Sequence, residues 1–155
     1  MADRLVNRPQ TTKLVKKMMD DYYEDLRQAP QQGRLVAWTV GPVPFEILRT
    51  MDVAFQHLET HGAFLANRLK DADGKKGSYV LKEMGHALGY VPDMCSYSRY
   101  VLGLAECIMR GETSDLRPEL ILPKPDFVVA TNECITMGYA AEAIGRFFNV
   151  PRFIL

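Results

Sequence analysis

Apolar residues recur every three or four positions near the start of the chain. From Thr12 to about Gln28 this spacing predicts an amphipathic helix, which ends before Pro30. Its expected buried stripe consists of Leu14, Val15, Met18, Met19, Tyr22 and Leu26. A polar turn follows, so we expect an N-terminal helical segment over residues 1–33 and an α/β domain over residues 34–155.

The rest of the chain alternates between short apolar runs and amphipathic stretches. The apolar runs predict strands at residues 35–40, 53–58, 126–132 and 152–155. The amphipathic stretches predict helices within 41–51 and over 62–70, 78–89, 98–109 and 134–148. This alternation is typical of an α/β fold with an open, mainly parallel sheet flanked by helices, as in Rossmann-like or flavodoxin-like proteins.

The last strand is apolar and is therefore expected to be buried in the sheet. Chain termini normally lie at the surface, so a terminus inside a buried strand is unusual. We expect the domain to continue beyond Leu155, as the N-terminal part of a longer protein.

Composition narrows the class of protein. The 155 residues are enough for one ordinary domain, and 19 basic residues balance 19 acidic ones. A chain without net charge has no global field that favours nucleic acid or an anionic membrane. No apolar run approaches the roughly 20 residues of a membrane span, and the sequence MADRLVNRPQ lacks the apolar core of a secretory signal. We therefore expect a cytoplasmic protein that binds neither nucleic acid nor membrane.

Three cysteines in a reducing compartment argue against a disulfide framework and leave metal binding or burial. Cys95, in VPDMCSYSRY, and Cys134, in TNECITMGYA, each follow an extended segment and precede a helix. The N–H groups and dipole at a helix N-terminus stabilise a thiolate, which is a soft ligand for iron–sulfur clusters, zinc or copper(I). Cys107 lies among apolar residues inside a predicted helix and is expected to be a buried hydrophobe.

The strings GPVPFEILRTMDV, PDMCSYSRYVLG and PDFVVATNEC, in this order, resemble the 2-hydroxyacyl-CoA dehydratase and benzoyl-CoA reductase family. The resemblance covers the chain from about Arg34 to its end. It implies an iron–sulfur enzyme acting on an acyl-CoA thioester, with a homologous sister subunit and an ATP-hydrolysing iron–sulfur activator protein. By position, Cys95 and Cys134 would be two of three cysteine ligands of a [4Fe–4S] cluster. The third is expected beyond Leu155.

Acidic and basic residues near the predicted strand ends are the remaining candidates. The resemblance assigns proton transfer at the substrate to Glu59 and to a serine, which Gly41 replaces here. Glu46, in the first turn of a predicted helix, is a candidate for substrate binding or for simple capping. His57 and His61 flank Glu59, and either could supply a proton, so we include His61 as a candidate substrate-binding residue.

Arg99, about one helical turn after Cys95, is a candidate for offsetting cluster charge or binding a CoA phosphate; a solvated helix face is the alternative. Neither GxGxxG nor GxxxxGK[ST] occurs in the chain, so ATP hydrolysis is expected in a partner protein.

Four functions stay open. The first expectation is the iron–sulfur subunit of a benzoyl-CoA-reductase-like enzyme, which reduces an aromatic acyl-CoA one electron at a time. The second is a subunit of a 2-hydroxyacyl-CoA dehydratase, which removes water by radical chemistry. A non-catalytic relay or scaffold subunit that carries a cluster is the third. The fourth is a small zinc domain, which would need Cys107 as a ligand as well.

Overall fold

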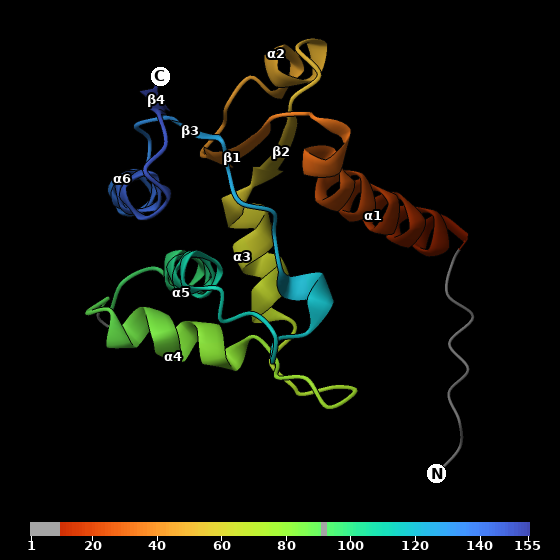
Figure 1. Ribbon diagram of the computed structural model, residues 1–155, viewed down its shortest axis with the longest axis vertical. Helices are drawn as coiled ribbons and strands as arrows, with labels where there is room; N and C mark the ends of the chain where they lie inside the picture. The colour runs from red at the N-terminus through yellow and green to blue at the C-terminus, as the bar shows by residue number, and fades with distance from the viewer. Residues whose placement is uncertain (1–9, 91–92) are drawn as a thin grey trace.

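Four short strands form one parallel sheet in the computed structural model, which describes residues 10–90 and 93–155 (Figure 1). The strands are β1 (Val36–Val40), β2 (Ala54–His57), β3 (Phe127–Ala130) and β4 (Arg152–Ile154), in the order β2-β1-β3-β4. The predicted α/β class and parallel sheet are confirmed. Two parts of the sequence predictions, residues 1–9 of the N-terminal segment and Val91–Pro92 of VPDMCSYSRY, lie outside the described residues.

The strand order contains a topological switch point between β1 and β3. The chain leaves β1 toward β2 on one side and later returns to the other side as β3. Crossover connections therefore diverge there, and open parallel sheets bind ligands in the resulting crevice at the carboxyl ends of the strands. The residues that follow β1 and β3 are thus the first place to look for a site.

Helices cover the two faces of the sheet unequally. The helices are α1 (Gln10–Gln28), α2 (Phe45–Thr50), α3 (Leu58–Ala66), α4 (Tyr79–Ala87), α5 (Ser96–Arg110) and α6 (Ile135–Phe148), with short 3-10 helices at Ala29–Gln32 and Pro118–Leu120. The main core joins one face of the sheet to α3, α5 and α6, and Trp38 is fully buried there against Phe148. A smaller core lies under α2 on the opposite face. None of these described helices is long and apolar enough to cross a membrane.

Two glycines let α4 and α5 cross closely. A Cβ atom at Gly103 would lie 1.8 Å from the carbonyl oxygen of Leu81, and one at Gly85 would lie 2.5 Å from that of Arg99. Any side chain at either position would force the two backbones apart. The α5 helix is consequently buried over most of its length between α3, α6 and α4.

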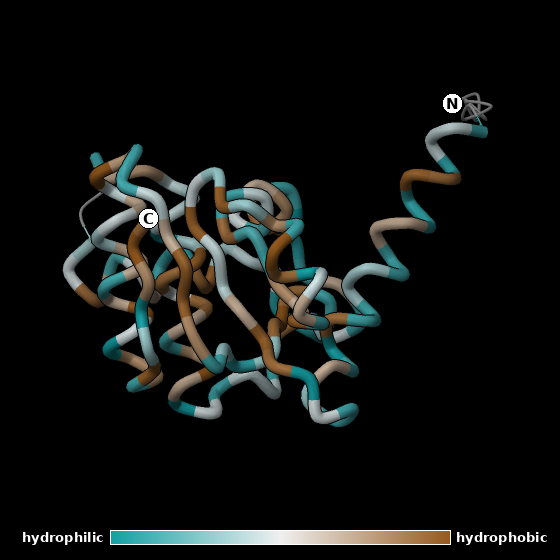
Figure 2. The backbone as a smooth tube through the Cα atoms, turned by 90° about the horizontal axis from the view of Figure 1, so that it is seen from above, coloured by the Kyte–Doolittle hydropathy of each residue, from teal (hydrophilic) through white to brown (hydrophobic). Residues whose placement is uncertain are grey.

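The expected burial along α1 is wrong for its first half. Tyr23 and Leu26 join the main core, whereas Leu14, Val15, Met18 and Met19 are 42–62% exposed. In Figure 2 this part of the helix projects away from the body of the molecule. Periodicity predicted the apolar face of the helix correctly but not what lies against it.

The start of α3 and the burial of β4 also differ from the sequence predictions. The α3 helix begins at Leu58, four residues before residue 62, because the side chain of His57 caps it by accepting from the N–H of Thr60. The β4 strand is an edge strand whose apolar residues Phe153 and Ile154 are more than half exposed, and not buried as we expected.

Candidate functional site

Both candidate ligand cysteines are helix N-caps. Cys95 precedes α5 and Cys134 precedes α6, and both thiols are free and exposed. Neither side chain makes a capping hydrogen bond with its own helix. The predicted setting, a thiol at the start of a helix, is therefore present twice.

The first turns of these two helices contact each other. Ser98, three residues after Cys95, donates a hydrogen bond of 2.8 Å to the sulfur of Met137, three residues after Cys134. Ser98 is fully buried, and Met137 is only 2% exposed. Each cysteine lies about one helical turn from this contact, so the packing of α5 on α6 sets the two thiols beside the same junction.

Cys107 has the opposite environment. It is 5% exposed in the last turn of α5, and burial, assisted by the charges of Glu112 and Glu106, raises the pKa of its thiol. Within residues 10–90 and 93–155, no three His, Cys, Asp or Glu side chains converge closely enough to hold a metal ion. The described part of the chain thus offers no three-cysteine zinc site.

The switch point itself is closed by a contact between Gly41 and Thr131. Gly41 follows β1 with φ +74°, and a Cβ atom there would lie 2.1 Å from Oγ1 of Thr131, which follows β3. The threonine hydroxyl therefore occupies the space in which a side chain at position 41 would begin. This Oγ1 is buried and has no hydrogen-bond partner among the described residues, so it is a free polar group at the strand ends.

His57 links the ends of β1 and β2. Its Nδ1 accepts from the hydroxyl of Thr60 at 2.9 Å, which places the ring proton on Nε2. That Nε2 lies 3.2 Å from the carbonyl oxygen of Gly41 and 3.2 Å from Oε2 of Glu59. The imidazole thus orients the partly exposed Glu59 carboxylate toward the end of β1, since it bridges both groups.

Glu46 lies nearby on α2 but joins no hydrogen bond or ion pair with the described residues. It is exposed in the first turn of the helix, where the dipole favours an acid. Its neighbour Phe45 packs edge-on against His57, with ring centroids 5.6 Å apart, and stacks on Phe55 at 5.0 Å. The α2 helix therefore supports His57, while the Glu46 carboxylate is turned to solvent.

The other histidine candidate, His61, lies in the core. It is fully buried, its Nδ1 accepts from the hydroxyl of Tyr23 at 3.1 Å, and its Nε2 donates to the carbonyl of Leu120 at 3.2 Å. Burial lowers the pKa of His61 to about 4, although the hydrogen bond to Leu120 acts in the other direction. A neutral ring with both nitrogens in use joins α1, α3 and the Pro118–Leu120 helix, and it has no free atom for a ligand.

A groove of about 930 Å³ opens beside His57, between α1 and α3. His57 and Thr60 form part of its wall, and most of the rest is apolar, including Met18, Met19 and Phe64. Its size and lining suit an apolar chain with a few polar groups at one end.

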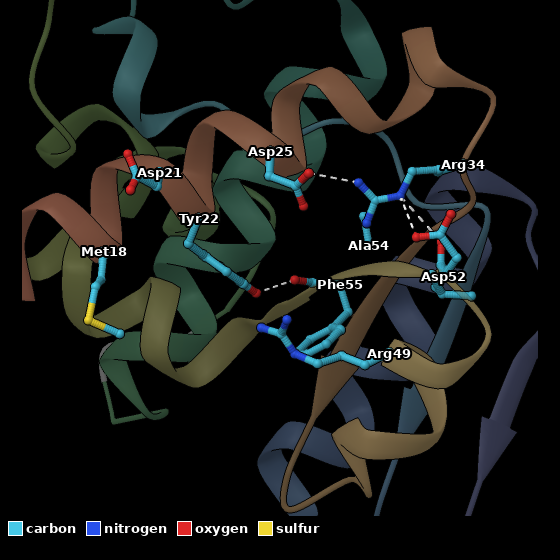
Figure 3. Close-up of a pocket in the computed structure, with 10 residues that line it drawn as sticks. Met18, Asp21, Tyr22, Asp25, Arg34, Arg49, Asp52, Ala54 and Phe55 are labelled. Carbon is cyan, nitrogen blue, oxygen red and sulfur yellow. Dashed lines mark hydrogen bonds and ion pairs between the residues drawn. The ribbon is translucent and has the colours of Figure 1, made fainter.

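A separate cavity of about 490 Å³ lies at the other end of β2 (Figure 3). There Arg34 pairs with Asp25 at 2.7 Å and with Asp52 at 3.1 Å, and the hydroxyl of Tyr22 donates to the carbonyl of Phe55. These contacts attach α1 to the edge strand. Because the carboxyl ends of the strands, where Cys134 and Glu59 follow β3 and β2, are elsewhere, we assign this cavity a structural role.

Fold and site together define the class of protein. It is an open parallel α/β domain with two thiols at helix N-termini, and its His57–Glu59 pair lies at the carboxyl ends of the strands. No family model matches the chain. Among curated proteins, it is 29% identical over 140 residues to lactoyl-CoA dehydratase subunit alpha of Anaerotignum propionicum, which covers 85% of this chain and 32% of that protein. It is also 27% identical over 143 residues to the (R)-2-hydroxyisocaproyl-CoA dehydratase alpha subunit of Clostridioides difficile, covering 92% of this chain and 32% of that protein.

These similarities confirm the resemblance carried by the cysteine strings. The curated homologues of the chain are alpha subunits of 2-hydroxyacyl-CoA dehydratases. The chain spans about a third of the length of the curated relatives that it matches.

One polar group at the strand ends was missed from the sequence, namely the hydroxyl of Thr131. Its place at the end of a predicted strand was a signal, since ligands bind at such ends. Its proximity to Gly41 was not visible, because 90 residues separate the two positions.

Proposed function

We propose that the chain is the N-terminal part of a 2-hydroxyacyl-CoA dehydratase subunit, a lyase that removes water from a 2-hydroxyacyl-CoA thioester. One observation carries the proposal: the thiols of Cys95 and Cys134 cap two helices whose first turns touch. Two exposed thiols at one junction are what shared ligation of a cluster requires. Both named relatives are dehydratase subunits, which favours this second expectation over the aromatic-ring reductase that ranked first from the sequence.

In this proposal Cys95 and Cys134 hold a [4Fe–4S] cluster together with ligands from outside the chain. The donor set fits the group in part, since both thiols are free, exposed and placed at positive helix ends. When bound, such a cluster supplies a Lewis-acidic iron and a low-potential electron. Cys107 takes no part, because it is buried in the interior of α5.

Glu59 is the proposed proton-transfer group. Removal of water from a 2-hydroxyacyl thioester needs a base for the carbon-bound proton and an acid for the leaving hydroxyl. The carboxylate of Glu59 is partly exposed, and Nε2–H of His57 holds one of its oxygens. His57 is a positioning residue here, since Gly41 and Thr60 fix its ring and tautomer.

The hydroxyl of Thr131 is the proposed substitute for the serine that the resemblance places at position 41. It is unpaired among the described residues and reaches the space beside Gly41. The hydroxyl of Thr131, which follows β3, can thereby take the place of a hydroxyl on the residue that follows β1. The absence of a serine at position 41 is then no obstacle to a dehydratase.

The groove beside His57 is the proposed space for part of the thioester, because its wall is mostly apolar and ends at His57 and Thr60. Glu46, exposed on α2, is a proposed contact at the outer rim of the same sheet edge. The buried His61 supports this wall from behind, and we assign it no contact with substrate. A homologous sister subunit and an ATP-hydrolysing activator protein complete the proposed system.

A turnover assay on the complete anoxic complex tests the proposal. We expect water loss from a 2-hydroxyacyl-CoA in the presence of the activator, and no ring reduction of benzoyl-CoA. Glu59→Gln is expected to lower kcat by about 10²- to 10⁴-fold with unchanged iron content, whereas Glu112→Gln, at an exposed residue outside the site, has no effect. Full activity in Glu59→Gln would remove Glu59 from the mechanism. Ring reduction of benzoyl-CoA without dehydration would favour the benzoyl-CoA-reductase-like subunit instead. A cluster without either activity would favour a non-catalytic relay subunit.

A further inference from the structure

Arg99 is a buried cation to which the described part of the chain supplies no anionic partner. Its side chain is on α5, one turn after Cys95, and the residue is only 7% exposed. Among residues 10–90 and 93–155, Nε of Arg99 has no hydrogen-bond acceptor, and the guanidinium joins no ion pair. A solvated helix face, the simpler expectation from the sequence, is therefore excluded.

An unpaired buried guanidinium is costly to the fold. Desolvation of a charge is offset only by a counter-charge or by a full set of hydrogen bonds. The close crossing of α4 over α5 at Gly85 fixes the position of the Arg99 backbone, since a Cβ atom at Gly85 would lie 2.5 Å from the Arg99 carbonyl oxygen. The fold thus retains a mostly buried positive side chain whose Nε–H donor is unused among the described residues.

The guanidinium lies in the wall of a pocket of about 510 Å³ between α4 and the start of α5. Lys82 and His86, one turn apart on α4, contribute two more basic side chains to this wall. Among the described residues that line the pocket, Glu83 is the one carboxylate, and it is exposed. Leu69, Tyr79 and Tyr100 form the remaining lining.

The positively charged side chains of this pocket favour an anionic ligand with several oxygen atoms. A guanidinium presents parallel N–H donors that match phosphate oxygens, and an ammonium adds a mobile second charge. A single carboxylate would satisfy Arg99 alone and leave Lys82 in water. A phosphate group, with nearly two charges and three free oxygens, can use both residues and an N–H of His86.

We propose that Arg99, Lys82 and His86 form a binding site for a phosphate group, distinct from the strand-end site of Cys134, Glu59 and Thr131. The phosphate belongs either to a CoA moiety or to a free phosphate or diphosphate. The site does not depend on the proposed dehydratase activity, because binding requires neither cluster nor turnover.

Calorimetric titration of the protein with inorganic pyrophosphate, at constant ionic strength in chloride, tests this site. We expect saturable binding that Arg99→Met and Lys82→Met each weaken by about 30-fold or more, since each substitution removes one of the positive charges that contact the phosphate. Lys124→Met, at an exposed lysine outside the pocket, should bind as the wild type does. Absence of binding, equal binding in all variants, or acetate binding as tightly as pyrophosphate would each refute the proposal.

The source of the phosphate follows from two further titrations, with CoA and with dephospho-CoA. Tighter binding of CoA than of both dephospho-CoA and pyrophosphate identifies the 3′-phosphate of CoA as the ligand. Equal or weaker binding of CoA relative to pyrophosphate identifies a free phosphate or diphosphate. Arg99→Met should remain folded, because it removes an unpaired buried charge; if it does not fold, Lys82→Met decides the result.

Discussion

Acidification should destabilise the protein through His61. The ring is fully buried and neutral, with Nδ1 accepting from Tyr23 and Nε2 donating to Leu120. Its pKa falls from the ordinary value of 6.5 to about 4 in the folded state, because burial penalises the imidazolium. Above pH 6.5 neither the folded nor the unfolded ring is charged, so the full stability is present. Between pH 6.5 and about 4 the unfolded chain binds a proton that the folded chain rejects, and the unfolding free energy drops.

The size of this loss follows from the difference in pKa. At about 1.36 kcal/mol per pH unit, a fall from 6.5 to about 4 corresponds to about 3 kcal/mol by pH 4. That is a large part of the roughly 5–15 kcal/mol that stabilises an ordinary domain. Below pH 4 this residue contributes no further loss, since both states then carry the proton.

Urea unfolding followed by circular dichroism from pH 7.5 to 4 measures the effect in the cluster-free chain. His61→Gln keeps an amide donor and acceptor in the site, so it should lower stability at pH 7 yet flatten the slope between pH 6.5 and 4. The exposed His86→Gln variant should keep the wild-type slope. If His61→Gln loses stability with pH as steeply as the wild type, the buried neutral imidazole is not the cause.

Three further outcomes are expected. Gly103→Ala should destabilise the protein by about 1–3 kcal/mol, because its Cβ would meet the carbonyl of Leu81, whereas Gly138→Ala, with open space around the new Cβ, should be neutral or stabilising by up to about 1 kcal/mol. Urea titration of the two variants checks this, and equal stability would contradict the close crossing of α4 and α5. Tyr22→Phe should cost about 1 kcal/mol through the lost hydrogen bond to the edge strand, and an unchanged urea midpoint would contradict that contact. Thr131→Val should retain the fold but lower dehydratase turnover, and unaltered turnover would show that the hydroxyl is not used.

Local sequence rules predicted the architecture well. Alternating apolar runs and amphipathic stretches indicated each strand to within about two residues, because strand and helix periods depend on near neighbours. The helix-cap positions of Cys95 and Cys134 were predicted for the same reason. Both precede amphipathic stretches, whose apolar periodicity is visible in a single sequence.

Contacts between distant segments were beyond local rules. The burial of Arg99 depends on the crossing of α4 and α5, which two glycines permit. The role of Thr131 depends on the adjacency of β1 and β3, and the core position of His61 depends on Tyr23 from another helix. The first half of α1 has the predicted apolar stripe, but this stripe is exposed. Periodicity predicts which face of a helix is apolar and does not predict whether another element packs against that face.

Iron and acid-labile sulfide per chain, measured after anoxic purification of the complete protein, test the central claim most directly. Cys95→Ala and Cys134→Ala should each lose most of the cluster and its EPR signal, because each removes one thiolate at the junction of α5 and α6. Cys107→Ala, at a thiol buried inside α5, should retain both. Wild-type iron, sulfide and spectrum in either of the first two variants would contradict ligation by the two helix-capping cysteines.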